Sequence, residues 1–252
     1  MTDHDLIHKL QKRIVEIYYQ ENLSCIRGLD SKYEIKDKQA LTWYMNITQK
    51  CIAKFGNQFN YLKNMDDLVL CSDEIMHFTA LTILYRPFIN NPIEDAFSTS
   101  EGLIFPNFQN LEAKRYYMYS DVVCEKIYNY WDRIGDLIAS FFPDLHKPKN
   151  IFFNTAIKKV PEEYRSLSSF NWLQSFSENE YQEINLRRIK VVHYATTDTT
   201  SRHDHIFKGT NKKEMKEWVQ KRFELADYFK NHINLTIEGF YQTLSFLEEI
   251  KI

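Results

Sequence analysis

Two arginines and a histidine stand close together in one short segment of the sequence. Arg187 and Arg188 are adjacent, and His193 follows Arg188 after Ile-Lys-Val-Val. A guanidinium can hold a phosphate through two parallel hydrogen bonds. A neutral imidazole can take a proton from a ribose 2′-hydroxyl, and an imidazolium can give one to the leaving 5′-oxygen. These residue types together would suffice for cleavage of RNA without a metal ion.

The segment that carries these residues, residues 178–195, is predicted to be a helix. At about 100° per residue its apolar side chains share one face, which comprises Ile184, Val191, Val192 and Ala195. Arg188 lies in the middle of that face, and His193 lies roughly 140° away from it. An arginine on an apolar stripe is costly unless it is paired. A structural alternative therefore pairs Arg188 with a carboxylate such as Asp132 or Asp136.

A polar segment follows this helix and carries more basic and titratable groups. Residues 196–213 are rich in Thr, Asp and His, and we expect them to form a loop. The groups that we expect to contact substrate are Lys190, Tyr194, Arg202, His203 and His205. His203 and His205 could instead begin a metal site, but no further ligand pair stands at a suitable spacing, so no metal is predicted.

Two other charged segments have ordinary interpretations beside the functional ones. Residues 208–222 are locally basic and could hold an RNA backbone, but the interspersed Glu214 and Glu217 favour a solvated face. Asp132 and Asp136 stand at i, i+4 and are interpreted as solvated, or as partners of the motif arginines. A di-metal bundle would need Glu-x-x-His repeats, and the sequence has none.

Helical patterns in the rest of the chain must position these groups. Only six Gly and six Pro are present, which favours helices over an all-β fold. We expect helices over residues 3–19, 37–55 and 72–85, with Ser72 as a cap and Pro87 as a stop. Residues 90–110 gather Pro, Gly, Asn and Ser, and they form the candidate domain boundary.

The second half has stronger helical patterns. A helix of about 30 residues is expected from Leu111 to a point before Pro143. Short helical pieces follow near Ala156 and over residues 161–172. The closing helix starts near Met215, and Asn231 and Gly239 are its candidate break points; we expect most aromatic rings to lie in the core.

Composition excludes several classes of protein. The 252 residues have a formal net charge of -2, so any surface that binds an anion must be local. The cysteines (Cys25, Cys51, Cys71 and Cys124) form no CxxC pair, which argues against a zinc ribbon and fits core thiols in a reducing compartment. Since neither a signal peptide nor a membrane span is recognisable, we expect a cytoplasmic protein without membrane contact. No cofactor is predicted.

The segment R-I-K-V-V-H, Arg188 to His193, resembles the R-x4-6-H motif of the HEPN superfamily. Arg187 also falls within the permitted spacing. The position after the motif arginine is often polar in that superfamily, whereas Ile189 follows Arg188 here, so either arginine fits the motif. Residues 126–142 resemble the long first helix of bacterial HEPN domains, and the resemblance spans roughly residues 101–252.

This resemblance implies a fold, an activity and partners. The expected fold is all-α, with a HEPN-like four-helix bundle over residues 101–252 and an additional N-terminal helical region, residues 1–100, of unknown role. The expected activity is metal-independent RNA cleavage in a toxin–antitoxin or anti-phage setting, at a site shared by the two protomers of a homodimer. His193 would be the acid/base residue and Arg188 or Arg187 the phosphate-binding residue. A regulatory or antitoxin protein is an expected partner.

The alternative is a catalytically inactive helical module for dimerisation or for binding RNA or a nucleotide. Ile189 and the lack of overall positive charge favour it. Some HEPN proteins are silenced by nucleotide transfer onto a tyrosine two residues after the histidine. Ala195 holds that position and Tyr194 is one residue early, so this control is not predicted.

Overall fold

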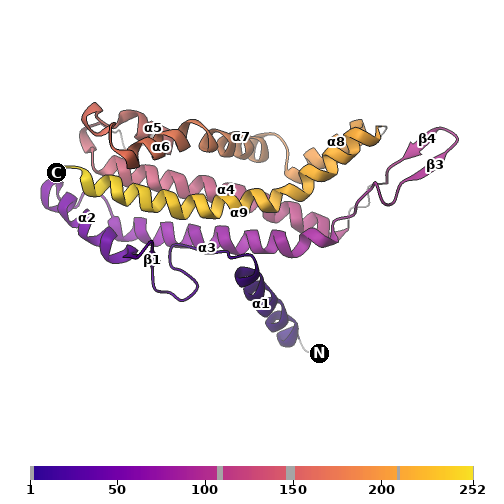
Figure 1. The fold of residues 1–252 in the computed structure, drawn as a ribbon, viewed down its shortest axis with the longest axis horizontal. Helices are drawn as coiled ribbons and strands as arrows, with labels where there is room; N and C mark the ends of the chain where they lie inside the picture. The colour runs from indigo at the N-terminus through magenta and orange to yellow at the C-terminus, as the bar shows by residue number, and fades with distance from the viewer. Residues whose placement is uncertain (1–2, 107–109, 146–150, 209–210, 252) are drawn as a thin grey trace. The chain divides into compact units, whose positions relative to one another are not determined.

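The computed structural model describes residues 3–106, 110–145, 151–208 and 211–251 of the chain. The described elements are mostly α-helices, with two small antiparallel hairpins, which confirms the all-α prediction (Figure 1). The chain divides into two compact units that alternate along the sequence. Unit 1 comprises Met1–Leu23, Met76–Cys124 and Arg187–Asn231, and unit 2 comprises Ser24–Ile75, Glu125–Leu186 and His232–Ile252.

The first elements differ in their bounds from the sequence patterns. They are α1 (Asp3–Gln20), β1 (Glu34–Ile35), β2 (Lys38–Gln39), α2 (Ala40–Phe55), α3 (Tyr61–Tyr85) and the 3-10 turn η1 (Arg86–Phe88). Helix α2 begins after the predicted Asp37, because Lys36 and Asp37 adopt left-handed backbone angles, φ 48° and 64°, in the turn of the first hairpin. The side chain of Gln39 caps α2 by accepting a hydrogen bond from the Thr42 amide at 2.7 Å.

Helix α3 starts well before the predicted Ser72 cap, since it begins at Tyr61. The Ser72 hydroxyl is buried and accepts a hydrogen bond from the Ile26 amide at 2.9 Å, so it serves a tertiary contact. By length and composition alone, Tyr61–Phe88 would also be long and apolar enough to cross a membrane, although no such span was predicted from the sequence. A core helix can meet the same criteria, and 44% of this apolar window is buried in the structure.

The middle of the chain holds the second hairpin and a long helix. Strands β3 (Phe97–Thr99) and β4 (Gly102–Ile104) pair antiparallel, and all of their residues are exposed on an arm of unit 1 (Figure 1). Helix α4 (Leu111–Ser140) has the predicted 30 residues. The apolar residues that recur at helical spacing along α4 are buried, among them Val123, Ile127, Tyr130, Ile134 and Leu137.

The remaining elements include one helix that was not predicted. They are η2 (Pro143–Leu145), α5 (Phe153–Lys159), η3 (Glu162–Tyr164), α6 (Ser168–Glu178), α7 (Glu180–His193), α8 (Thr197–Lys208) and α9 (Lys212–Glu249). The prediction of a polar loop over residues 196–213 is wrong, because α8 occupies most of it. Helix α9 is unbroken at both candidate break points.

Unit 2 has a core of stacked aromatic rings. The Trp131 ring lies 3.9 Å from Phe176 and 4.9 Å from Phe153, measured between ring centroids. Gly239 of α9 leaves room for this ring, since a Cβ atom there would overlap Cη2 of Trp131 and lie 2.8 Å from Cζ3. Gly239 is therefore a packing requirement and no helix break.

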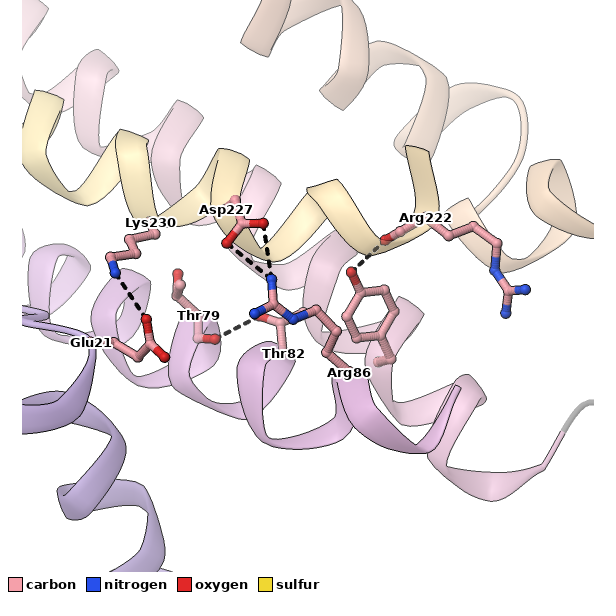
Figure 2. Close-up of polar contacts among 8 residues, drawn as sticks. Glu21, Thr79, Thr82, Arg86, Arg222, Asp227 and Lys230 are labelled. Carbon is pink, nitrogen blue, oxygen red and sulfur yellow. Dashed lines mark hydrogen bonds and ion pairs between the residues drawn. The ribbon is translucent and has the colours of Figure 1, made fainter. Parts of the chain in front are cut away.

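Unit 1 combines small apolar clusters with many polar contacts. One cluster is built on Ile89, Ala113, Tyr116 and Tyr117, and the other on Phe105, Met215, Trp218 and Val219. Figure 2 shows two ion pairs on α9, with Arg86 Nη1 2.9 Å from Asp227 and Lys230 Nζ 2.9 Å from Glu21. The guanidinium of Arg222 points away from both pairs.

Candidate functional site

The motif residues lie on the last two turns of α7. Tyr181 and Ile184 are buried on this helix, and Arg188 follows on the same face and is half-buried. Of the predicted apolar stripe around Arg188, Ile184 is buried and Val191 and Ala195 are half-buried, whereas Val192 is 43% exposed. Lys190 and His193 are exposed, so the histidine side chain is open to a substrate from solvent.

Arg187 makes a contact that was not predicted from the sequence. Its guanidinium carbon lies 4.3 Å from the centroid of the Tyr228 ring of α9. Such a cation–π contact is attractive because the ring face is negative. Arg187 thus has a structural partner in unit 1, and the choice between Arg187 and Arg188 as the phosphate-binding residue stays a prediction.

The chain leaves α7 through a tight turn. The Lys190 carbonyl accepts hydrogen bonds from the amides of Tyr194 and Ala195, at 3.0 Å and 2.9 Å. The helix ends at His193, and Tyr194, the next residue, is 81% exposed. An exposed ring next to the motif histidine could stack on a base.

Helix α8 carries the other residues that were predicted to contact substrate. It begins at Thr197, after the short connection formed by residues 194–196. The carboxylate of Asp121 in α4 accepts hydrogen bonds from the Thr197 hydroxyl and, at 3.3 Å, from its amide. Arg202 and His203 are exposed, and Arg202 forms a 3.6 Å ion pair with Asp198. Contact of these two residues with a substrate stays a prediction.

His205 is turned inward and not toward solvent. Its Nε2 atom lies 2.8 Å from the Phe105 carbonyl oxygen, and its ring lies 5.3 Å from the ring of Trp218. Burial lowers the pKa of His205, and the nearby charge of Arg222 acts in the same direction, while the Phe105 carbonyl opposes them. The structure therefore gives this residue a structural partner, and its predicted contact with substrate remains untested.

The helical form of α8 also bears on the metal interpretation of His203 and His205. Residues two apart on a helix lie about 200° from one another, so these two side chains leave α8 on different sides. Within the described residues, no group of three or more His, Cys, Asp or Glu side chains could hold a metal ion.

Asp132 differs from its predicted solvated state. In unit 2 its carboxylate accepts hydrogen bonds from the Tyr181 hydroxyl at 3.1 Å and from the Phe153 amide at 3.4 Å. Burial raises the pKa of Asp132 to about 6, against the lowering effect of these two hydrogen bonds. Its neighbour Asp136 forms a 3.4 Å ion pair with Arg133, and burial raises its pKa as well.

Arg222 of α9 is buried, whereas the sequence placed it at the end of the basic segment 208–222, for which a solvated face was favoured over contact with an RNA backbone. Only 5% of the residue is exposed, and its guanidinium lies 4.3 Å from the Trp218 ring centroid. Nε donates to the Tyr117 hydroxyl, which also lies 2.8 Å from the Ser201 hydroxyl of α8. Arg222 stands on the apolar stripe of α9, so its position is detectable in the same way as that of Arg188.

The described part of the chain is mostly helical, as the resemblance implies. The family model HEPN_Cthe2314-like HEPN matches residues 71–248, and the chain belongs to this family. No curated protein and no solved structure matches the chain. The resemblance noted in the sequence is thereby confirmed at the level of the family.

The matched range begins earlier than the resemblance indicated. It starts at residue 71, within α3, whereas the motif-based resemblance covered roughly residues 101–252. The boundary at residue 100 between an N-terminal region and the bundle stays a prediction.

Proposed function

We propose that the protein is a metal-independent endoribonuclease of HEPN type. The observation that carries this proposal is the Arg-x4-His segment of a HEPN-family chain, with Arg188 half-buried and His193 exposed at the end of α7. The proposed setting is toxin–antitoxin or anti-phage defence in the cytoplasm. A regulatory or antitoxin protein would then control the activity.

The proposed reaction needs two histidines, and one chain supplies one at this motif. A neutral His193 would remove the proton of a ribose 2′-hydroxyl, whose oxygen attacks the adjacent phosphorus. The P–O5′ bond then breaks, and the imidazolium of His193 from a second copy donates a proton to the 5′-oxygen. Arg188 or Arg187 would bind the non-bridging phosphate oxygens, on which negative charge accumulates. The products are a 2′,3′-cyclic phosphate and a 5′-hydroxyl.

A second candidate function is a HEPN-family module that binds RNA or a nucleotide, or forms dimers, without cleavage. Two observations favour it. Ile189 stands where a polar residue often follows the motif arginine, and Arg187 is held against Tyr228. A module of this kind would use the same surface for binding only.

Incubation of the purified full chain with labelled single-stranded RNA in EDTA tests the proposal. The comparison is with His193→Ala and with His8→Ala, a matched change of an exposed histidine in α1. We expect cleavage by the wild type and by His8→Ala, with 2′,3′-cyclic phosphate ends, and none by His193→Ala. Loss of one acid/base group typically lowers a rate by about 10²–10⁴-fold.

Two other results would contradict the proposal. RNA cleavage that survives in His193→Ala would move the reaction to another centre. Binding of RNA by a folded wild-type dimer, without cleavage at any protein concentration, would favour the inactive module.

Co-expression of the wild-type chain with an excess of His193→Ala tests the shared site. A heterodimer would have one motif histidine in place of two, so the activity per wild-type chain should fall as the excess rises. Co-expression with the same excess of His8→Ala is the control and should leave that activity unchanged. An activity per wild-type chain that does not respond to His193→Ala would place a complete site in each protomer.

A further inference from the structure

Helix α8 faces the rest of unit 1 with a stripe of polar residues. Thr197, Ser201 and His205 stand at i, i+4 and i+8, which places them on one side of the helix. Each makes a hydrogen bond: Thr197 to Asp121, Ser201 to Tyr117, and His205 to the Phe105 carbonyl. The helix is thus attached through polar contacts that recur about one turn apart.

The described side chains that anchor α8 are polar, and the His205 ring also packs against the ring of Trp218. Ser201 is buried there, while Ile206 is 69% exposed. Most helices in proteins are held by an apolar face, since propensity alone does not stabilise a short helix. Water can replace these hydrogen bonds when the helix leaves, so the net stabilisation is modest for the two neutral contacts and larger for the Thr197 bonds to the Asp121 carboxylate. These properties fit a helix that detaches and reattaches without unfolding the unit.

The middle contact leads to a buried positive charge. Tyr117 joins Ser201 to Arg222, whose other side-chain hydrogen bond runs from Nη1 to the Asn90 carbonyl at 3.3 Å. Both of these partners are neutral, and no ion pair joins Arg222 to a carboxylate of the described residues. A buried guanidinium without a counter-charge is unfavourable, so it is poised to gain from an anion.

Helix α8 also brings a negative charge toward this centre. Burial raises the pKa of Tyr117, the Arg222 charge lowers it, and the charge of Asp198, next to the first anchor of α8, raises it. Detachment of α8 would remove Asp198 together with the Ser201 hydroxyl. The Arg222 guanidinium and the Tyr117 hydroxyl would then be left as donors that face solvent.

We infer that α8 is a reversible cover over a phosphate-binding site formed by Arg222 and Tyr117. The site would take a backbone phosphate of a single-stranded RNA. Arg222 and Tyr228, whose ring contacts Arg187, are six residues apart on α9, which is about 9 Å along the helix and about 120° around it. The choice of RNA as the source of the phosphate rests on the proposed function, whereas the cover and the anion site do not.

Hydrogen exchange of α8 in the intact chain, followed by mass spectrometry, tests this inference. The probes are inorganic phosphate and a 2′-O-methyl RNA oligonucleotide, which cannot be cleaved, at constant ionic strength. We expect either probe to speed exchange in α8, with the oligonucleotide acting at the lower concentration. Ser201→Ala removes the hydrogen bond between α8 and Tyr117. The probe concentration that gives half of the increase in α8 exchange, the half-effect concentration, should then fall several-fold, because less of the binding energy is used to detach α8.

Matched variants separate this effect from general loosening. Thr200→Ala changes an exposed neighbour on the same helix and should leave the half-effect concentration unchanged. Arg222→Gln should abolish the response to both probes, and Arg222→Lys should retain part of it. A phosphate response that persists in Arg222→Gln, or identical α8 exchange in Ser201→Ala and wild type, would overturn the inference.

The same experiment in His193→Ala distinguishes this inference from the proposed nuclease. The anion response should persist in that variant even though cleavage is lost. If both probes speed α8 exchange but the wild type cleaves no RNA, the proposed nuclease activity is refuted and the phosphate site under α8 is retained. A response to phosphate but none to the oligonucleotide would overturn RNA as the ligand.

Discussion

The aromatic core of unit 2 and the polar contacts around α8 in unit 1 hold their helices by different means. Around Trp131, the Phe176 ring stacks at 3.9 Å and the Phe153 ring packs at a tilt at 4.9 Å between centroids, and the missing Cβ atom at Gly239 makes room for the Trp131 ring. Around α8, hydrogen bonds to Asp121, Tyr117 and the Phe105 carbonyl anchor the helix through its described polar side chains. Apolar packing is lost only when the unit unfolds, whereas water can substitute for hydrogen bonds one at a time.

The largest effect should come from Gly239→Ala in unit 2. The new methyl group would overlap the Trp131 ring, which Phe176 and Phe153 prevent from moving. We expect the free energy of unfolding to fall by about 3 kcal/mol, measured by urea denaturation. Asn231→Ala, an exposed change on the same helix, is the control. Recovery of part of the loss when Gly239→Ala is combined with Trp131→Phe would locate the clash, and an unchanged free energy would refute the packing account.

The next effect should be the pH dependence that Asp132 confers on unit 2. Its folded pKa of about 6 lies above the ordinary value of about 3.9, so the folded state binds the proton more tightly. The stabilisation from this group is therefore fully present below about pH 4 and is lost as the pH rises through about 6. Asp132→Asn should lack this decline, so the difference in unfolding free energy between variant and wild type should change with pH across this range, as measured by urea unfolding at a series of pH values. A difference that is constant with pH would contradict it.

His205 should give α8 a pH dependence of the opposite sign. Burial lowers the pKa of His205, so its contribution is present above about pH 6.5 and is lost as the pH falls through the depressed folded value. We expect α8 exchange, corrected for intrinsic rates, to become faster as the pH falls. His205→Gln can keep a donor to the Phe105 carbonyl and should remove this trend. Equal pH trends in both proteins would assign the effect to other groups that titrate, such as His77, whose pKa burial also lowers.

The smallest effect should come from the exposed ion pairs of unit 1. Glu21→Gln breaks the 2.9 Å contact with Lys230 that Figure 2 shows, between side chains about a third exposed. Such pairs contribute little, because solvent screens them and two long side chains lose freedom. We expect a change in unfolding free energy below about 1 kcal/mol, measured by the same urea denaturation. A fall in unfolding free energy as large as that of Gly239→Ala would show that water does not substitute for the polar contacts of unit 1 one at a time.

Much of the fold follows from sequence patterns, and the misses have physical causes. The stripe of α4 was readable because its apolar residues recur at helical spacing and are buried. Helix α8 was missed because its Thr, Ser and Asp residues favour turns, and tertiary hydrogen bonds outweigh that preference. Ser72 resembled a helix cap because no local pattern distinguishes a capping hydroxyl from one that accepts the Ile26 amide from a distant segment.

Some features of the candidate site could likewise be predicted from the sequence, and others required the fold. The exposed His193 and the half-buried Arg188 could be placed from their spacing on α7 alone. The inward turn of His205 and the contact of Arg187 with Tyr228 could not, because they depend on segments far apart in the sequence. Arg222 was detectable by its position on an apolar stripe, but its link to α8 through a tyrosine hydroxyl required the fold.

The β3–β4 arm has a practical use in the laboratory. Every residue of its two strands is exposed, and Ser100 and Glu101 form the turn between them. Exposed tips of this kind accept insertions better than packed segments do. A peptide tag or a fluorescent label inserted between Ser100 and Glu101 would label the protein without disturbing the core of either unit. The same point could provide the new termini of a circularly permuted chain.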